Sequence, residues 1–301
     1  GAVGSMMSLL RTAMLPNLFR ERMDEMGLDF SVIYSTMGIR LPAHEDEEIR
    51  RAGTRALNTM MADLYLPHAD RMTPVAAIPM HTPGEAVAEL HHVVEELGYK
   101  AVMVVGNLCR PVPAVAKQAP ELARYATWVD PIAFGSIHDY DPVWQVCQDL
   151  KVAVTAHSSS MGWGARATTT IYIYNHVASF AAANEAFCKA VVLGGLTRRF
   201  PKLNFAFLEG GVGWACELYT GLVSHCGKRN RHDIQRLNPA SADQVLLRQL
   251  MKSHGGDVFA RLPEAAGLGS GQMGGGHTED PAMIDELVLC GVEKAEDLRP
   301  L

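Results

Sequence analysis

Short apolar segments recur along the first three quarters of the chain, and longer mixed segments separate them. The apolar segments are rich in β-branched and aromatic residues, which predicts buried β-strands. They occupy residues 28–36, 74–80, 101–105, 152–155 and 203–209. Because the intervening segments carry helix signals, strand and helix alternate from residue 28 to about residue 227. This alternation predicts βαβ units and a parallel sheet, so the fold class is α/β.

Start and stop signals define the predicted helices. Acidic residues open a long helix over residues 45–70, where the helix dipole favours them. Asp141 followed by Pro142 predicts an N-cap and a first helical position. The predicted helices cover residues 1–27, 45–70, 82–97, 141–150, 171–193 and 214–226. Residues 37–44 are predicted to form a loop, and residues 108–140 a long irregular connection containing four prolines.

The alternation stops after Lys228. Helices are predicted near residues 242–253 and 281–290, and we expect the glycine-rich residues 263–280 between them to be poorly ordered. The predicted domains are therefore residues 1–227, which carry the strands, and residues 228–301, a helical and glycine-rich extension. Five strands are three fewer than an eight-stranded barrel needs. An open five-stranded sheet and an incomplete barrel with two unpaired edges both remain possible.

Composition and charge narrow the function classes. The formal net charge is −6, with 20% charged residues, so no basic patch indicates nucleic-acid binding. No apolar run reaches membrane-spanning length, and the N-terminus does not resemble a signal peptide. The six cysteines are scattered and none forms a CxxC motif, which is typical of reduced thiols in a cytoplasmic protein.

Two predicted strands each end in one reactive side chain. His157 follows the segment VAVTA, and Glu209 ends the segment LNFAFLE before a glycine turn. Parallel barrels carry their chemistry at the C-terminal ends of strands, so we expect both residues at one edge. His157 is a candidate metal ligand, and the alternative is a hydrogen-bonded histidine. Glu209 is a candidate base or ligand, and the alternative is a carboxylate that caps the next helix.

Four further residues lie just after predicted strands or in the loop beyond His157. Arg40 and His81 each follow a strand end, so both are candidates to face a substrate. Asn107 and Trp163 are candidates to line the same pocket. Solvated loop positions, or packing within the loops, are the alternative interpretations for all four.

Several short motifs in a fixed order resemble one family. They are residues 23–29 (MDEMGLD), 78–80 (IPM), 155–157 (TAH), 194–195 (GG), 200–203 (FPKL) and 210–211 (GG). Together they resemble the amidohydrolase superfamily of metal-dependent hydrolases, in the branch of aminocarboxymuconate-semialdehyde decarboxylase and γ-resorcylate decarboxylase. The resemblance spans roughly residues 20–227.

The resemblance implies a (β/α)₈ TIM-type barrel with one divalent metal, usually zinc, at its C-terminal mouth. His157 matches the family's ligand on the fifth strand, whereas the His-x-His pair of the first strand is absent. Glu209 stands where the family commonly has an acid/base histidine. The chain is therefore expected to be an incomplete barrel, either a fragment or a chain that has lost the missing strands.

Two functions are compatible with this resemblance. The first is a metal-dependent hydrolase or non-oxidative decarboxylase that acts on a small organic acid or amide. The second is a non-catalytic barrel homologue or fragment that serves in binding or oligomerisation. The expected partners are a small-molecule substrate and a second copy of the chain in a homo-oligomer, without nucleic acid or membrane.

Overall fold

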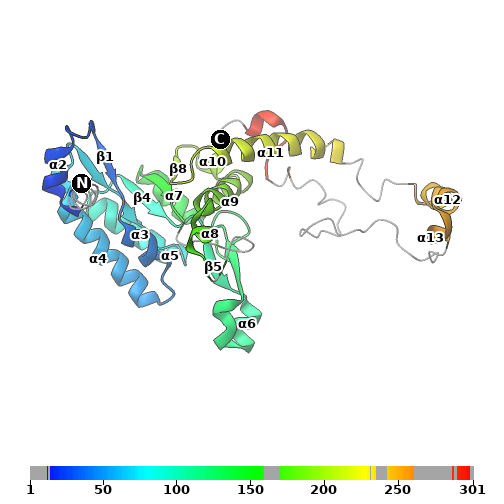
Figure 1. Cartoon of the computed structure of the whole chain (residues 1–301), viewed down its shortest axis with the longest axis horizontal. Coiled ribbons are helices and arrows are strands. Elements are labelled where there is room, and N and C mark those ends of the chain that lie inside the picture. Colours follow the sequence, from blue (N-terminus) through cyan, green and yellow to red (C-terminus); the bar gives the residue numbers. More distant parts are fainter. Residues whose placement is uncertain are drawn as a thin grey trace. The chain divides into compact units, whose positions relative to one another are not determined.

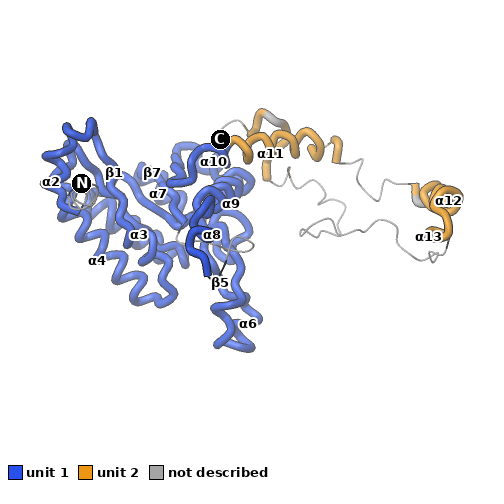
Figure 2. The backbone as a smooth tube through the Cα atoms, in the orientation of Figure 1, with its two compact units in different colours: residues 1–215 blue, residues 216–301 orange. Residues whose placement is uncertain are grey.

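The computed structural model describes residues 12, 14–158, 168, 170–230, 232–234, 243–260, 287 and 290–298. The chain divides into two compact units, residues 1–215 and 216–301 (Figure 2). All described strands belong to the first unit. The second contains most of α11 (Gly213–Arg229), together with α12 (Gln244–His254), α13 (Gly256–Ala260) and a 3₁₀ turn, Ala295–Leu298. The predicted domain boundary between residues 227 and 228 stays a prediction.

Parallel strands form the centre of the first unit (Figure 1). The strands are β1 (Ser31–Ile33), β2 (Met72–Pro74), β3 (Ala76–Ala77), β4 (Ala101–Val104), β7 (Ala153–Ala156) and β8 (Phe205–Phe207). One sheet has the order β3-β4-β7-β8, and β1 pairs in parallel with β2. Val75, which lies between β2 and β3, donates its N–H to the carbonyl of Ile33 at 3.0 Å. Each strand thus lies beside the next in the sequence, and all five predicted strands are confirmed.

The major helices pack on one face of these strands. They are α4 (Glu47–Tyr65), α5 (Pro83–His91), α7 (Asp141–Asp149) and α9 (Ser179–Leu193). Alternate strand residues such as Ala76, Val104 and Val154 share a buried cluster with side chains from all four helices. A doubly wound sheet reverses its strand order and carries helices on both faces, whereas a (β/α) barrel does neither. The arrangement is therefore of the barrel type, although the described strands do not close.

The opposite face of the strands is covered in part by the short helix α3 (Thr36–Arg40). A Cβ at Gly38 would lie 3.2 Å from the Met103 side chain and 3.4 Å from that of Ala77, so glycine permits this close approach. The predicted loop over residues 37–44 is therefore wrong. It consists of the end of α3 and a 3₁₀ turn, Leu41–Ala43, because packing against the strands orders it.

A second correction concerns residues 108–140. They include an antiparallel ribbon of β5 (Leu108–Pro111) and β6 (Thr127–Asp130), with α6 (Pro113–Gln118) and a 3₁₀ helix (Pro120–Tyr125) between them. Pro113 and Pro120 each open a helix, where proline is tolerated because the first N–H needs no helical acceptor. A buried ion pair between Arg110 and Asp130 joins the two strands. Most of this connection is therefore regular.

The caps of two helices explain where those helices begin. Asp46 caps α4 by accepting the N–H of Ile49 at 2.9 Å, as expected for an acidic start. Thr82 and Glu85 form a reciprocal capping box at the start of α5. A π-helical turn, His92–Glu96, extends α5 before Gly98, whose φ of +84° suits glycine.

Two predicted helix boundaries need correction. Tyr140 rather than Asp141 occupies the N-cap position of α7, because the Asp139 carboxylate accepts the N–H of Asp141 and Asp141 is already helical. The helix predicted over residues 171–193 is divided into α8 (Tyr172–His176) and α9. Ala178, with a φ of +58°, breaks it, because a left-handed residue cannot continue an α-helix.

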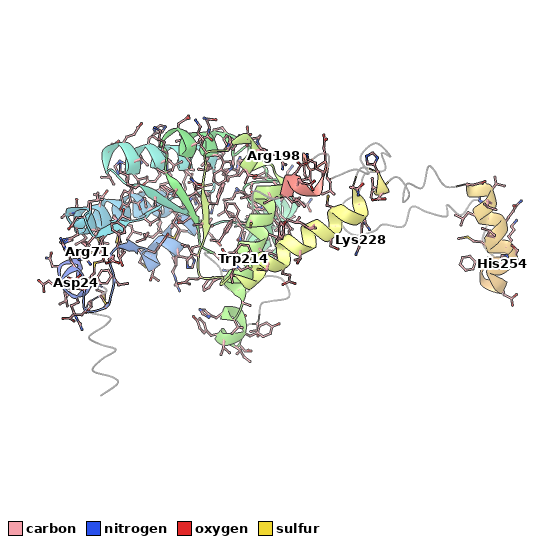
Figure 3. All side chains as sticks on the ribbon, turned by 90° about the horizontal axis from the view of Figure 1, so that it is seen from above. Asp24, Arg71, Arg198, Trp214, Lys228 and His254 are labelled. Carbon is pink, nitrogen blue, oxygen red and sulfur yellow. The ribbon has the colours of Figure 1, made fainter. Side chains whose placement is uncertain are left out.

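At the N-terminal side, α2 (Pro16–Arg22) ends with Met23 as its C-cap, so the predicted helix end at Gly27 is wrong: residues 23–27 form a turn, in which Gly27 has a φ of +69°. Arg71 pairs with Asp24 at 2.9 Å across this region (Figure 3). No helix among the described ranges is long and apolar enough to cross a membrane. The expected disorder of residues 263–280 and most of the helix predicted over residues 281–290 lie outside the described residues.

Candidate active site

His157 directly follows β7, a central strand of the sheet. Its N–H donates to the carbonyl of Val104 on β4 at 3.0 Å, so the backbone is held by its neighbouring strand. The side chain is 5% exposed, and Nδ1 lies 3.0 Å from the backbone carbonyl oxygen of Ser158. A carbonyl oxygen only accepts, so Nδ1 carries the proton that is donated to it. Nε2 is thereby presented to the C-terminal edge.

Glu209 lies on a tight turn after β8, with a φ of +58° that is uncommon for a residue with a side chain. Two side chains hold this turn. Asn184 of α9 donates to the carbonyl of Leu208 at 2.8 Å, and Trp214 of α11, labelled in Figure 3, donates to that of Gly211 at 2.9 Å. A Cβ at Gly210 would lie 2.5 Å from Asn184 Nδ2, so only glycine fits there.

The two candidate residues meet at this edge. Glu209 Oε2 lies 3.2 Å from His157 Nε2, although the Glu209 side chain is 62% exposed. The prediction that parallel strands bring the two together is confirmed. Among the described residues the Glu209 carboxylate pairs with His157 and shows no contact with the amides that open the following helix, so the capping alternative is not favoured.

The contact has a chemical consequence for His157. Acceptor oxygens face both ring nitrogens, the Ser158 carbonyl at Nδ1 and the Glu209 carboxylate at Nε2. A neutral imidazole carries one N–H, so it satisfies only one of them. With the proton on Nδ1, the Nε2 lone pair lies beside the Glu209 carboxylate, and the two together can hold a cation. Such a pair is typical of metal sites.

The donor set falls short of a complete metal shell. Stable zinc sites use about three or four protein ligands. In the part of the chain that the structure describes, no three His, Cys, Asp or Glu side chains gather into a group that could hold a metal ion. His157 and Glu209 fit two positions of such a shell, and any further ligands would come from outside the described residues.

Aromatic side chains form a wall beside His157. The Phe180 ring lies edge-on at 5.0 Å from the His157 ring, and His176 lies 5.3 Å beyond Phe180. Tyr172 stacks on His176 at 5.3 Å and is exposed. The sequence pattern predicts neither Phe180 nor Asn184 as a site residue. Both lie on α9, and only the three-dimensional packing of that helix brings them to the site.

His81 follows β3 and lies beside a buried polar network. Arg110 donates to the His81 carbonyl at 3.1 Å and to the Tyr140 hydroxyl at 2.8 Å, while Tyr140 donates to the carbonyl of Met80. Burial, reinforced by the positive charges of Arg50 and Arg110, lowers the pKa of the His81 imidazole to about 4. His81 is therefore an uncharged imidazole at neutral pH.

This lowered pKa predicts a loss of stability in acid. The unfolded chain protonates His81 near its ordinary pKa of 6.5, whereas the folded chain does so only near 4, so stability falls as the pH decreases through that window. We expect a loss of about 2 kcal/mol, allowing for partial solvent access. Urea denaturation at pH 7 and pH 4 measures it. His81→Gln should remove this component, and His91→Gln, at an exposed histidine, should not.

The remaining candidates have different surroundings. Asn107 is 3% exposed, just beyond β4. Arg40 is exposed, at the end of α3. Trp163 lies outside the described residues. The structure therefore places His81, Asn107, His157 and Glu209 after adjacent strands. It gives the Arg40 side chain no partner within the described part of the chain.

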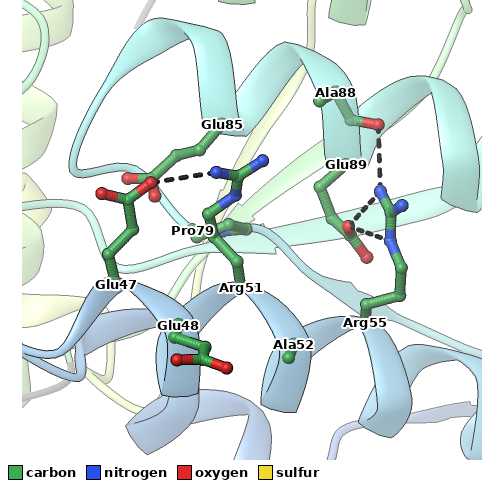
Figure 4. A pocket seen from close by; sticks show the side chains of 9 residues that line it. All are labelled: Glu47, Glu48, Arg51, Ala52, Arg55, Pro79, Glu85, Ala88 and Glu89. Carbon is green, nitrogen blue, oxygen red and sulfur yellow. Dashed lines mark hydrogen bonds and ion pairs between the residues drawn. The ribbon is translucent and has the colours of Figure 1, made fainter.

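A pocket of about 560 Å³ lies elsewhere, between α4 and α5 (Figure 4). Arg51 pairs with Glu47 at 2.9 Å, and Arg55 pairs with Glu89, also at 2.9 Å. Glu85, which lines the same pocket, is buried against Arg50 at 3.1 Å. Because these charges already pair with one another, the pocket presents no reactive group comparable to His157.

A profile of the amidohydrolase family matches residues 20–257. The amidohydrolase map2389c from Mycobacterium avium subsp. paratuberculosis K-10 is 18% identical, with a TM-score of 0.53 over 79% of this chain and 61% of that one. A structure of an amidohydrolase II is 15% identical, with a TM-score of 0.52 over 71% of this chain and 61% of that one. A dihydroxybenzoic acid decarboxylase from Polaromonas sp. JS666, solved with bound manganese and 2-nitroresorcinol, is 20% identical. Its TM-score is 0.46 over 62% of this chain and 51% of that one.

Parallel strands in sequential order, with the helices on one face, define an α/β protein of the barrel type. Since the profile covers most of its length, the chain belongs to the amidohydrolase family. The solved structures with TM-scores above 0.5 agree with this family's TIM-barrel-like fold. The chain spans between 51% and 59% of the length of the decarboxylases reported among its structural matches.

Proposed function

We propose that this protein is a metal-dependent hydrolase or non-oxidative decarboxylase that acts on a small organic acid or amide. The observation that carries the proposal is the contact between His157 and Glu209. With Nδ1 bonded to the Ser158 carbonyl, the Nε2 lone pair and the Glu209 carboxylate lie side by side and together can hold a cation. Membership of the amidohydrolase family supports the cation.

In this proposal His157 is a metal ligand and Glu209 is the acid/base. The Nδ1–H bond to the Ser158 carbonyl fixes the ring so that Nε2 faces the edge, as partners of ligating histidines commonly do. A divalent metal, zinc or another, supplies Lewis-acid chemistry when bound. The exposed Glu209 carboxylate can take up a proton and return it. Arg40, His81 and Trp163 are proposed to contact the substrate.

A second candidate is a non-catalytic barrel homologue used in binding or homo-oligomerisation. The small number of possible metal ligands favours this candidate, because the described residues gather no group of three such ligands. The cytoplasm is the proposed location for either candidate, and its support is the scattered spacing of the six cysteines.

Metal content separates the two candidates. The 301-residue chain and a version extended at both ends are purified, and zinc and manganese per chain are measured by elemental analysis. For the chain itself we expect well below one metal, since two donors leave an ion mostly hydrated. For the extended protein we expect about one, lost on His157→Ala. An extended protein without metal would favour the non-catalytic candidate.

Stoichiometric metal in the 301-residue chain itself, lost on His157→Ala, would contradict the expectation of an incomplete shell. It would show that ligands outside the described residues complete the site within this chain. Hydrolysis or decarboxylation by the extended protein, reduced by Glu209→Gln with the metal retained, would support the role of Glu209.

A further inference from the structure

Asn107 carries a buried side-chain amide whose donors are unused. The residue is 3% exposed, and its Nδ2 has no acceptor among the described residues. Buried amides are almost always hydrogen-bonded, because an unpaired donor forfeits its bonds to water. Asn58 illustrates the usual situation, since its amide donates to Ala77 and Glu89 and accepts the N–H of Ala77. The unused donors of Asn107 thus indicate a missing partner.

The backbone places Asn107 at the candidate active site. It follows β4, which lies between β3 and β7, so its position is between the strand ends that carry His81 and His157. Gly106 turns the chain there with a φ of +73°, and a Cβ on it would meet Phe187 at 3.5 Å. The turn at Gly106 therefore fixes the position of the Asn107 backbone. Asn107 lies at the same C-terminal edge as His157 and Glu209.

A second polar atom at this edge also has no partner. Nδ1 of His81 is buried and makes no hydrogen bond in the described part of the chain. His81 and Asn107 therefore leave two buried polar atoms unsatisfied at neighbouring strand ends. Hydrophobic packing does not explain such a pair, whereas a ligand that brings its own polar atoms does.

We propose that Asn107 Nδ2 donates a hydrogen bond to an sp² oxygen of the substrate, either a carboxylate oxygen or an amide carbonyl. The inference rests on the proposed function for its substrate class, small organic acids and amides. Asn107 is then a specificity-determining residue. It fixes the oxygen at the edge where His157 and Glu209 meet.

The test uses two probes, benzoate and benzamide, with the 301-residue chain labelled with ¹⁵N at asparagine. Binding of either probe should shift the Asn107 side-chain amide resonance, and its assignment comes from its loss in Asn107→Leu. The same variant should bind the probe roughly tenfold more weakly. It should melt at or above the wild-type temperature, because an unsatisfied donor is removed. The probe that binds more tightly shows whether the oxygen that Asn107 binds belongs to a carboxylate or to an amide.

Asn58→Leu is the matched control, because it removes a buried amide whose partners are all present. It should melt at a lower temperature and bind the probes as wild type does. If Asn107→Leu does not fold, Asn107→Asp provides the affinity comparison, with benzoate binding lost through charge repulsion. Neither measurement depends on metal, so a failure here is distinct from a failure of the proposed function.

Two results would overturn the proposal. One is an Asn107 amide resonance that neither probe shifts. The other is an Asn107→Leu variant that binds as wild type does but melts at a clearly lower temperature, which would mean that the amide serves an internal water.

Discussion

Replacing Asp130 by alanine is expected to lower the free energy of unfolding by about 3–5 kcal/mol, because it leaves a buried guanidinium without its counter-ion. Asp130 is fully buried and pairs with Arg110. Its carboxylate also accepts from the Ser136 hydroxyl at 2.8 Å and from the N–H of Ile132 at 2.9 Å. Urea denaturation at pH 7 measures the change.

The matched control is Asp141→Ala, which breaks an ion pair that is exposed on both sides. Asp141 and Arg199 are each 43% exposed at a separation of 2.7 Å. Exposed pairs contribute little, so we expect a loss below about 1 kcal/mol. Equal losses in the two variants would mean that the Asp130 pair is solvated. A variant with Asp130 and Arg110 both replaced by apolar residues should recover part of the stability.

Replacing Gly210 by alanine is expected to displace the turn that carries Glu209. The added Cβ would lie 2.5 Å from Asn184 Nδ2 and 2.8 Å from Trp214 Nε1, so one of the two hydrogen bonds that hold the turn must break. Overpacking of this kind costs about 1–3 kcal/mol of stability. A shift of the carboxylate by about 1 Å should also lower the kcat/KM of the catalytically competent protein on the order of 100-fold.

Gly213→Ala serves as the control for this prediction. A Cβ at Gly213 meets nothing within 4 Å, and the residue opens α11. Alanine is the better helix former, so stability should stay the same or increase by up to about 1 kcal/mol. Denaturation curves of both variants, with kcat/KM measured in the extended protein, give the comparison. A Gly210→Ala variant that matches Gly213→Ala in both would show that the turn is not constrained.

The strands and the meeting of His157 with Glu209 could be predicted because both depend on local pattern. Apolar segments bounded by glycine define the strands, and parallel pairing brings their ends to one edge whatever the connecting helices do. The ribbon of β5 and β6 could not be predicted in this way. Its stability comes from the pairing of Arg110 with Asp130, twenty residues apart, which no local pattern reveals.

The supporting residues of the site were missed for a similar reason. Asn184 lies inside an alanine-rich helix and Phe180 near its start, where a polar and an aromatic side chain carry no positional signal. Their roles depend on how α9 packs beside β7 and β8. The short helix α3 was also missed, because its burial depends on the missing Cβ of Gly38 rather than on helix propensity.

The sequential order of the strands also bears on how the first unit folds and evolves. Because the parallel strands pair in the order in which they occur along the chain, every new pairing closes one crossover connection rather than a loop across the whole unit, which limits its entropic cost. A ribosome-bound chain can therefore add one strand and one helix at a time to the same growing edge. For the same reason, whole strand–helix units can be gained or lost at that edge during evolution without rearranging the pairs already formed.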